Sequence, residues 1–133
     1  MRAITRKARR LLAVALVACA WLGAGAATAD SADDAVSKAN SMAYEAAIKC
    51  FIADGILTGD EREKGDKAKE ATFEAKARQS FETAEKLGDA LGYSGTHVNE
   101  DFGLAQAREM AKLMYDSAYF KRTAQTCKAL GLM

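Results

Sequence analysis

The 133-residue chain contains no proline, one histidine and three cysteines. A zinc site with two histidine ligands is therefore excluded. No Cys-x-x-Cys pair occurs, which excludes a thioredoxin-type redox motif and the attachment sequence of a c-type haem. The serines, acids and the histidine match no known catalytic spacing. We therefore expect a protein without catalytic activity, cofactor or bound metal.

The lack of proline also bears on the fold, because proline is the residue that interrupts helices most strongly. β-branched residues are few, whereas Ala, Lys, Glu, Leu and Met are abundant. These residues have high helix propensity. The composition predicts an all-α protein, and the short links between its expected helices predict a small antiparallel bundle.

The start of the chain has the three parts of a secretory signal peptide. The first ten residues carry five positive charges, and residues 11–29 carry none and are rich in Ala and Leu. This apolar segment ends in the small-x-small sequence Ala27-Thr28-Ala29. We predict a signal peptide over residues 1–29, Sec-type export, cleavage after Ala29, and a mature domain, residues 30–133, that is periplasmic or secreted.

Three other interpretations of this leader compete. Residues 11–29 reach the minimum length of a membrane span, but their second half is only weakly apolar. Arg9-Arg10 is typical of twin-arginine export, but the residues that usually flank it are absent. Leu16-Val17-Ala18-Cys19 resembles the site at which a lipoprotein cysteine is lipidated. We expect no membrane span in the mature form, with a lipid anchor at Cys19 as the alternative.

Cleavage would change the charge of the protein. The mature chain would keep all 18 acidic residues and lose five of the 19 basic ones, so its net charge would be −4 rather than +1. No basic stripe would remain, which argues against nucleic acid as a partner.

Apolar periodicity and turn residues predict three or four helices. The first covers residues 33–53 and ends at Asp54-Gly55, with a link running through Gly59. The second begins at Glu61 or Asp66 and ends at residue 91. Ser94 or Thr96 caps the third, which reaches about residue 116. A break at Asp116-Ser117 would begin a fourth helix, stopped by Gly131, whereas a bend there would leave three.

Two apolar stripes at helical spacing predict which faces point into the core. The stripe of the second helix comprises Phe73, Ala77, Phe81, Ala84, Leu87 and Leu91. The stripe of the third comprises Leu104, Ala107, Ala111, Met114 and Ala118, with Phe102, Met110 and Leu113 flanking it. Gly88 and Gly103 each cost about 1 kcal/mol in a helix. We therefore hypothesise that they allow these two helices to approach closely, with Phe81 or Phe102 packed over the gap.

Two further patterns have chemical consequences. After cleavage the chain keeps two cysteines, Cys50 and Cys127, which predicts one disulfide in an oxidising compartment. The run from Asp60 to Glu70 has a glycine where a calcium loop requires one, but basic residues occupy two ligand positions. This run is better interpreted as an exposed helix start with charges of both signs.

The turn between the second and third helices is the candidate functional surface. Tyr93, Ser94, Thr96 and His97 are the candidate partner contacts there. We expect a small exported protein that binds another envelope protein. Alternatives are an inhibitor or immunity-type protein directed against a toxin, a carrier of a small apolar ligand or of haem held by His97 with Met42 or Met110, and a small hydrolase.

Overall fold

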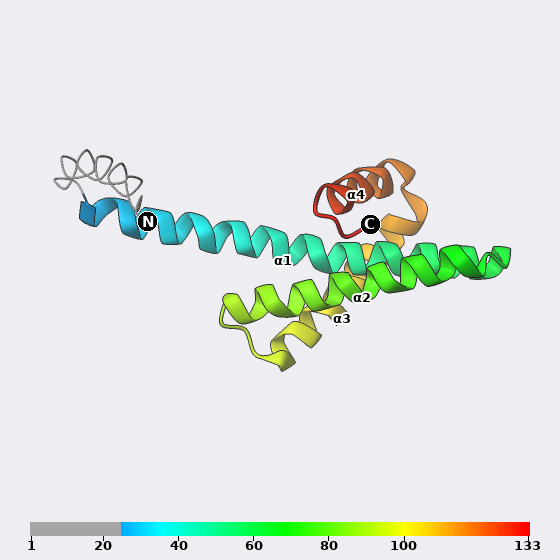
Figure 1. Cartoon of the computed structure of the whole chain (residues 1–133), viewed down its shortest axis with the longest axis horizontal. Coiled ribbons are helices and arrows are strands. Elements are labelled where there is room, and N and C mark those ends of the chain that lie inside the picture. Colours follow the sequence, from blue (N-terminus) through cyan, green and yellow to red (C-terminus); the bar gives the residue numbers. More distant parts are fainter. Residues whose placement is uncertain (1–24) are drawn as a thin grey trace, which may run out of the picture. The chain divides into compact units, whose positions relative to one another are not determined.

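The computed structural model describes residues 25–133, with side chains from Asp30 onward, and contains four α-helices in that part of the chain (Figure 1). They are α1 (Gly25–Lys64), α2 (Lys67–Ala90), α3 (Gly95–Tyr115) and α4 (Ser117–Ala129). No strand occurs in the described residues, so the predicted all-α bundle is confirmed. Asp116 alone separates α3 from α4, which decides between three and four helices.

The chain divides into two compact units, residues 1–35 and residues 36–133. Of the first unit, the structure describes only the start of α1. The predictions for residues 1–24, including a lipid anchor at Cys19, lie outside the described residues. The predicted cleavage site falls within α1 and stays a prediction. Within residues 25–133, no helix combines the length and the apolar character that a membrane span requires.

The predicted break at Asp54-Gly55 is wrong, because α1 continues through Gly55 and Gly59 and ends only at Lys64. A Cβ added at Gly55 or Gly59 would meet nothing within 4 Å. The other side of the same turns is buried, with Asp54 fully enclosed and Thr58 and Glu61 nearly so. Burial of this side outweighs the cost of about 1 kcal/mol that each glycine adds to a helix.

The chain instead turns at Gly65, where φ is +77° and only glycine is free of strain. Asp66 caps α2 by accepting a hydrogen bond from the Lys69 amide, so the later of the two predicted starts is correct. The charged run from Asp60 to Glu70 forms ion pairs around this turn, Arg62–Glu70 and Lys64–Glu61 among them. Most of this run is exposed and carries both signs, as interpreted, but Glu61 is buried, and the run covers the end of α1 as well as the start of α2.

α2 runs back alongside residues 36–64 of α1, and α3 covers the pair, so that aromatic rings from all three helices meet. The ring centroids of Phe81 and Phe102 lie 4.9 Å apart, and those of Phe51 and Phe102 lie 5.1 Å apart. The predicted stripe of α2 lies on this inner side: Ala84 is buried, and Phe81, Leu87 and Leu91 are partly buried against the core.

The predicted disulfide is present. Cys50 of α1 and Cys127 of α4 are bonded, both are fully buried, and their Cα atoms lie 5.6 Å apart. The C-terminus folds over the same region, because the Leu132 amide donates to the Cys127 carbonyl and Leu132 is buried. Gly131, with φ at +71°, allows this reversal and stops α4 as predicted.

The predicted core face of α3 is wrong. Leu104 and Met114 are 66% and 55% exposed, and Ala107, Ala111 and Ala118 are also exposed. The buried residues of α3 lie on the opposite side: Val98, Phe102, Ala105, Glu109 and Leu113. Of the flanking positions, Phe102 and Leu113 are thus core residues, and Met110 packs against them.

The close approach hypothesised for the two helical glycines occurs at one of them, and the side chains nearest to it are Val98, Tyr44 and Tyr93 rather than Phe81 or Phe102. A Cβ at Gly88 would lie 2.8 Å from Val98 Cγ2 and 3.4 Å from Tyr44 Cε2, so three helices meet closely there. A Cβ at Gly103 would meet nothing within 4 Å, because this residue faces outward.

Candidate functional site

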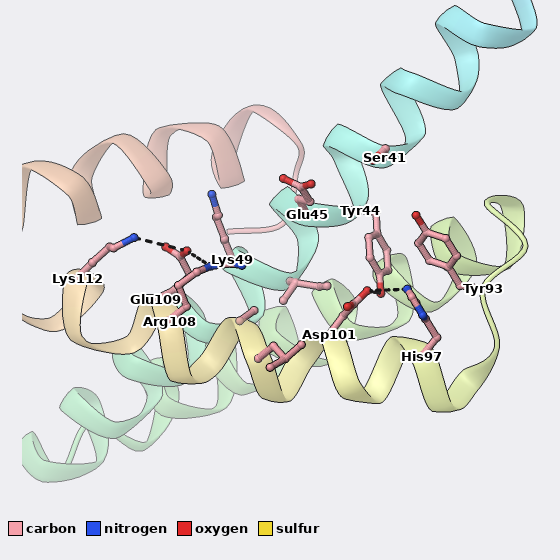
Figure 2. A pocket seen from close by; sticks show the side chains of 13 residues that line it. Ser41, Tyr44, Glu45, Lys49, Tyr93, His97, Asp101, Arg108, Glu109 and Lys112 are labelled. Atoms are coloured by element: carbon pink, nitrogen blue, oxygen red, sulfur yellow. Dashed lines mark hydrogen bonds and ion pairs between the residues drawn. The ribbon is translucent and has the colours of Figure 1, made fainter.

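A groove with a volume of about 590 Å³ lies between α1 and α3 (Figure 2). Side chains of α1 form one wall and side chains of α3 form the other, and most of them are charged or carry a hydroxyl group. The groove residues are Ser41, Tyr44, Glu45, Ile48 and Lys49 of α1; Tyr93 of the connecting turn; and His97, Asp101, Leu104, Ala105, Arg108, Glu109 and Lys112 of α3.

At one end of the groove, the Asp101 carboxylate connects α1 with the first turns of α3. Tyr44 donates its hydroxyl proton to Asp101 Oδ2 at 2.8 Å, and His97 Nε2 lies 3.3 Å from the same oxygen. Burial raises the pKa of Tyr44, and its hydrogen bond to Asp101 raises it further. Tyr93 packs against both rings, with centroid distances of 5.4 Å to Tyr44 and 4.4 Å to His97.

At the other end, Glu109 is almost fully buried, and both of its carboxylate oxygens accept hydrogen bonds. Tyr119 of α4 donates a hydrogen bond to Glu109 Oε2, and Arg108 donates one at 2.8 Å to Oε1. Burial opposes ionisation of Glu109, but these two bonds and the charges of Lys49 and Lys112 outweigh it and lower the pKa of the carboxyl. The hydrogen bond to Glu109, aided by burial, raises the pKa of Tyr119 to about 12.

Between the two ends, Glu45 and Lys49 project from successive turns of α1 (Figure 2). Neither forms an ion pair within 4 Å with any side chain in the described part of the chain. The groove therefore presents one acid and one base whose charges are not neutralised by close contacts, held between two satisfied polar clusters.

The structure brings together two of the four residues predicted to contact a partner. Tyr93 and His97 line the groove, and His97 remains about half exposed. Ser94 instead caps α3 by accepting a hydrogen bond from the His97 amide, as the sequence allowed. Thr96 is exposed but does not line the groove.

Sequence reasoning missed the α1 wall and the middle of α3. Tyr44 and Asp101 are separated by 57 positions, and no local pattern connects them. One signal was available, because Asp101 follows His97 by four residues and the two side chains therefore share a helix face. The mixed charges of Arg108, Glu109 and Lys112 were a second signal.

The groove does not provide the haem ligands considered from the sequence. Met110 packs against the core, and Met42 lies in a separate groove of about 260 Å³ between α1 and α4. Neither methionine shares the groove with His97. Among the described residues, no three His, Cys, Asp or Glu side chains are arranged to hold a metal ion.

The geometry is suited to binding. Ser41 lies in the groove, but no hydrogen bond connects it to His97 within residues 30–133, so a nucleophile with its base is not assembled there. Aromatic faces, carboxylates and exposed cations are groups that recognise polar surfaces. No known protein family, curated protein or solved structure matches this chain.

Proposed function

We propose that this is an exported protein without catalytic activity that binds another protein of the cell envelope or the extracellular space. The observation that carries the proposal is the α1–α3 groove, in which Glu45 and Lys49 form no ion pair within 4 Å with any described side chain. A partner that supplied the opposite charges would gain two ion pairs without displacing those already formed.

The neighbourhood of the groove favours a protein as the partner. Leu104 on the α3 wall is 66% exposed. Met42 is equally exposed, and it lines the neighbouring α1–α4 groove, which shares Glu45 and Lys49 with the α1–α3 groove. Exposed methionine and leucine next to polar side chains are typical of protein-binding surfaces. An inhibitor or immunity-type protein is one version of this function. A carrier of an apolar ligand is not supported by a lining of charged and hydroxyl groups.

The buried disulfide and the described helices, none of which could span a membrane, are compatible with a location outside the cytoplasm. We propose that residues 1–29 are a Sec-type signal peptide removed during export. Mass spectrometry of the exported protein checks this point. A mature chain beginning at Asp30 agrees with it, and a lipidated Cys19 at the new terminus contradicts it.

Site-specific photo-cross-linking in the producing cell tests the binding proposal. A photo-reactive amino acid replaces Ser41 inside the groove or, as the matched control, the exposed Ala75 on α2. We expect one cross-linked partner from position 41, none from position 75, and a much weaker product when Lys49→Glu is added. No product from position 41, or the same product from both positions, would refute the proposal.

A further inference from the structure

Four cationic side chains from three helices meet where the α1–α3 groove adjoins the α1–α4 groove. Lys49 of α1 lines both grooves. Arg108 and Lys112 of α3 line the first groove, and Arg122 of α4 lines the second. Figure 2 shows the first three of these residues at the same end of the α1–α3 groove, away from the turn between α2 and α3. We refer to Lys49, Arg108, Lys112 and Arg122 as the cationic cluster.

Contacts within the fold hold three of these cations in place. The Arg108 guanidinium donates to Glu109 Oε1 at 2.8 Å, and Lys112 Nζ lies 3.9 Å from the same oxygen. Lys112 Nζ and the Arg122 guanidinium carbon each lie 5.9 Å from the ring centroid of Tyr119, whose hydroxyl donates to the same carboxylate. The side chains of Arg108, Lys112 and Arg122 are nevertheless exposed, so their other N–H groups are available to a ligand.

The charges at the cationic cluster do not balance. Glu109 is the only acid of residues 30–133 that lies within 4 Å of any of the four cations. Glu45 lines both grooves but forms no ion pair in this part of the chain, so two negative charges accompany four positive ones. Lys49, which is only partly exposed, has no ion pair there either. Residues 30–133 as a whole have a net charge of −4, so this excess of positive charge is local.

We propose that the cationic cluster binds an acidic segment of the partner protein, which presents two or more Asp or Glu side chains to it. This deepens the binding function proposed above and rests on it, because the cluster forms one end of the same groove. Guanidinium and ammonium groups form strong, charge-assisted hydrogen bonds with carboxylates. A short segment fits better than a long polyanion, such as a nucleic acid or a sulfated glycan, which would extend beyond the cluster over a surface of net negative charge.

Selection from a peptide library tests the chemistry of the ligand without knowledge of the partner. Random eight-residue peptides displayed on phage are selected on the oxidised, exported protein after immobilisation. We expect the selected peptides to be enriched in Asp and Glu relative to the starting library. Raising the salt concentration during selection should reduce their recovery, because salt screens contacts between exposed charges. Selected peptides without an excess of acids, or no enrichment at all, would overturn the proposal.

Substitutions in the cationic cluster test whether it is the binding site. Lys49→Gln and Arg122→Gln are suitable because neither side chain hydrogen-bonds to Glu109, and circular dichroism checks that both variants stay helical. Each should raise the Kd of a selected acidic peptide roughly threefold, and the pair roughly tenfold. Glu45→Gln should lower it roughly threefold, because a like charge is removed. Lys86→Gln, at an exposed lysine of α2, is the matched control and leaves the Kd unchanged. An unaltered Kd in the double variant, or weaker binding by Glu45→Gln, would contradict the proposal.

Competition separates an acidic protein segment from other anionic ligands. Heparin, as a sulfated glycan, and vesicles that contain anionic lipid are each added to the peptide complex, and we expect neither to displace the peptide at an equal concentration of charges. Displacement by either would assign the cluster to that polyanion and overturn the proposal. A partner cross-linked from position 41 without selection of acidic peptides would refute the acidic segment alone, whereas no cross-linked partner would refute the proposed function itself.

Discussion

Replacing Asp54 by Asn should remove most of the pH dependence of stability above pH 5. Asp54 is fully buried where α1 packs on α2, and its Oδ1 atom has no hydrogen-bond partner in the described residues. The other carboxylate oxygen is 3.5 Å from the Ser80 hydroxyl. Burial raises the pKa of Asp54 to about 7, against the smaller opposing effects of the Ser80 hydrogen bond and the Lys76 charge.

The direction of the effect follows from proton linkage. In the unfolded chain this carboxyl has a pKa of 3.8, so between about pH 4 and pH 7 the folded protein holds a proton that the unfolded chain has released. Rising pH therefore favours unfolding over this interval, and the effect levels off above pH 7. One pKa unit corresponds to about 1.4 kcal/mol, so the whole interval amounts to at most about 4 kcal/mol.

Urea unfolding at pH 5, 6, 7 and 8 measures the effect. We expect the free energy of unfolding of the wild type to fall over this series and that of Asp54→Asn to stay nearly level. Asp60→Asn is the matched control, because Asp60 is an exposed acid on the same helix, and it should keep the wild-type slope. Equal slopes for the wild type and Asp54→Asn would show that Asp54 does not titrate in this range and would refute the reasoning.

Three further predictions concern packing. Gly88→Ala should lower the free energy of unfolding by about 1–3 kcal/mol, because the new methyl group would press on buried Val98. Gly103→Ala should raise it by up to about 1 kcal/mol, because this position has free space. Urea unfolding in dilute solution compares the two variants, and equal effects would contradict the packing. Reduction of the Cys50–Cys127 disulfide, which closes a loop of 77 residues, should cost about 4 kcal/mol by chain entropy, measured as unfolding with and without a reductant. Tyr119→Phe removes a hydrogen bond to the Glu109 carboxylate and should cost about 1–3 kcal/mol at pH 7. The loss should shrink in acid, once the pH falls below the lowered pKa of that carboxyl, and a loss independent of pH would contradict this role.

Local chemistry made much of the fold predictable from the sequence. The Ser94 cap, the glycine stop at Gly131 and the cysteine pair each rest on a rule that involves few residues. The error at Asp54-Gly55 has a different origin. An acid followed by glycine favours a turn locally, but burial against α2, which is distant in sequence, holds this segment in a helix.

The error in α3 arises from two competing stripes. The stripe chosen from the sequence contains more apolar positions, but three of them are alanines, which bury little area. The other contains Val98, Phe102 and Leu113, whose larger side chains gain more from burial. Glu109 hid the second stripe, because an acid in the middle of it argues against a core position. The structure accommodates that acid through Tyr119 and Arg108, partners that no count along a single helix reveals.

Glu109 is nearly buried and Asp54 is fully buried, yet their surroundings shift the pKa values of these two acids in opposite directions. Glu109 accepts two hydrogen bonds and lies near two lysines, which together lower its pKa despite burial. Asp54 has one long contact to a hydroxyl, and burial raises its pKa. The contribution of Glu109 is lost as the pH falls through its lowered pKa, and burial of Asp54 costs increasing stability as the pH rises from about 4 towards 7. The fold should therefore be most stable in mildly acidic solution, between these limits. Asp54→Asn should extend that optimum to higher pH, and Glu109→Gln should weaken the fold mainly above its lower limit.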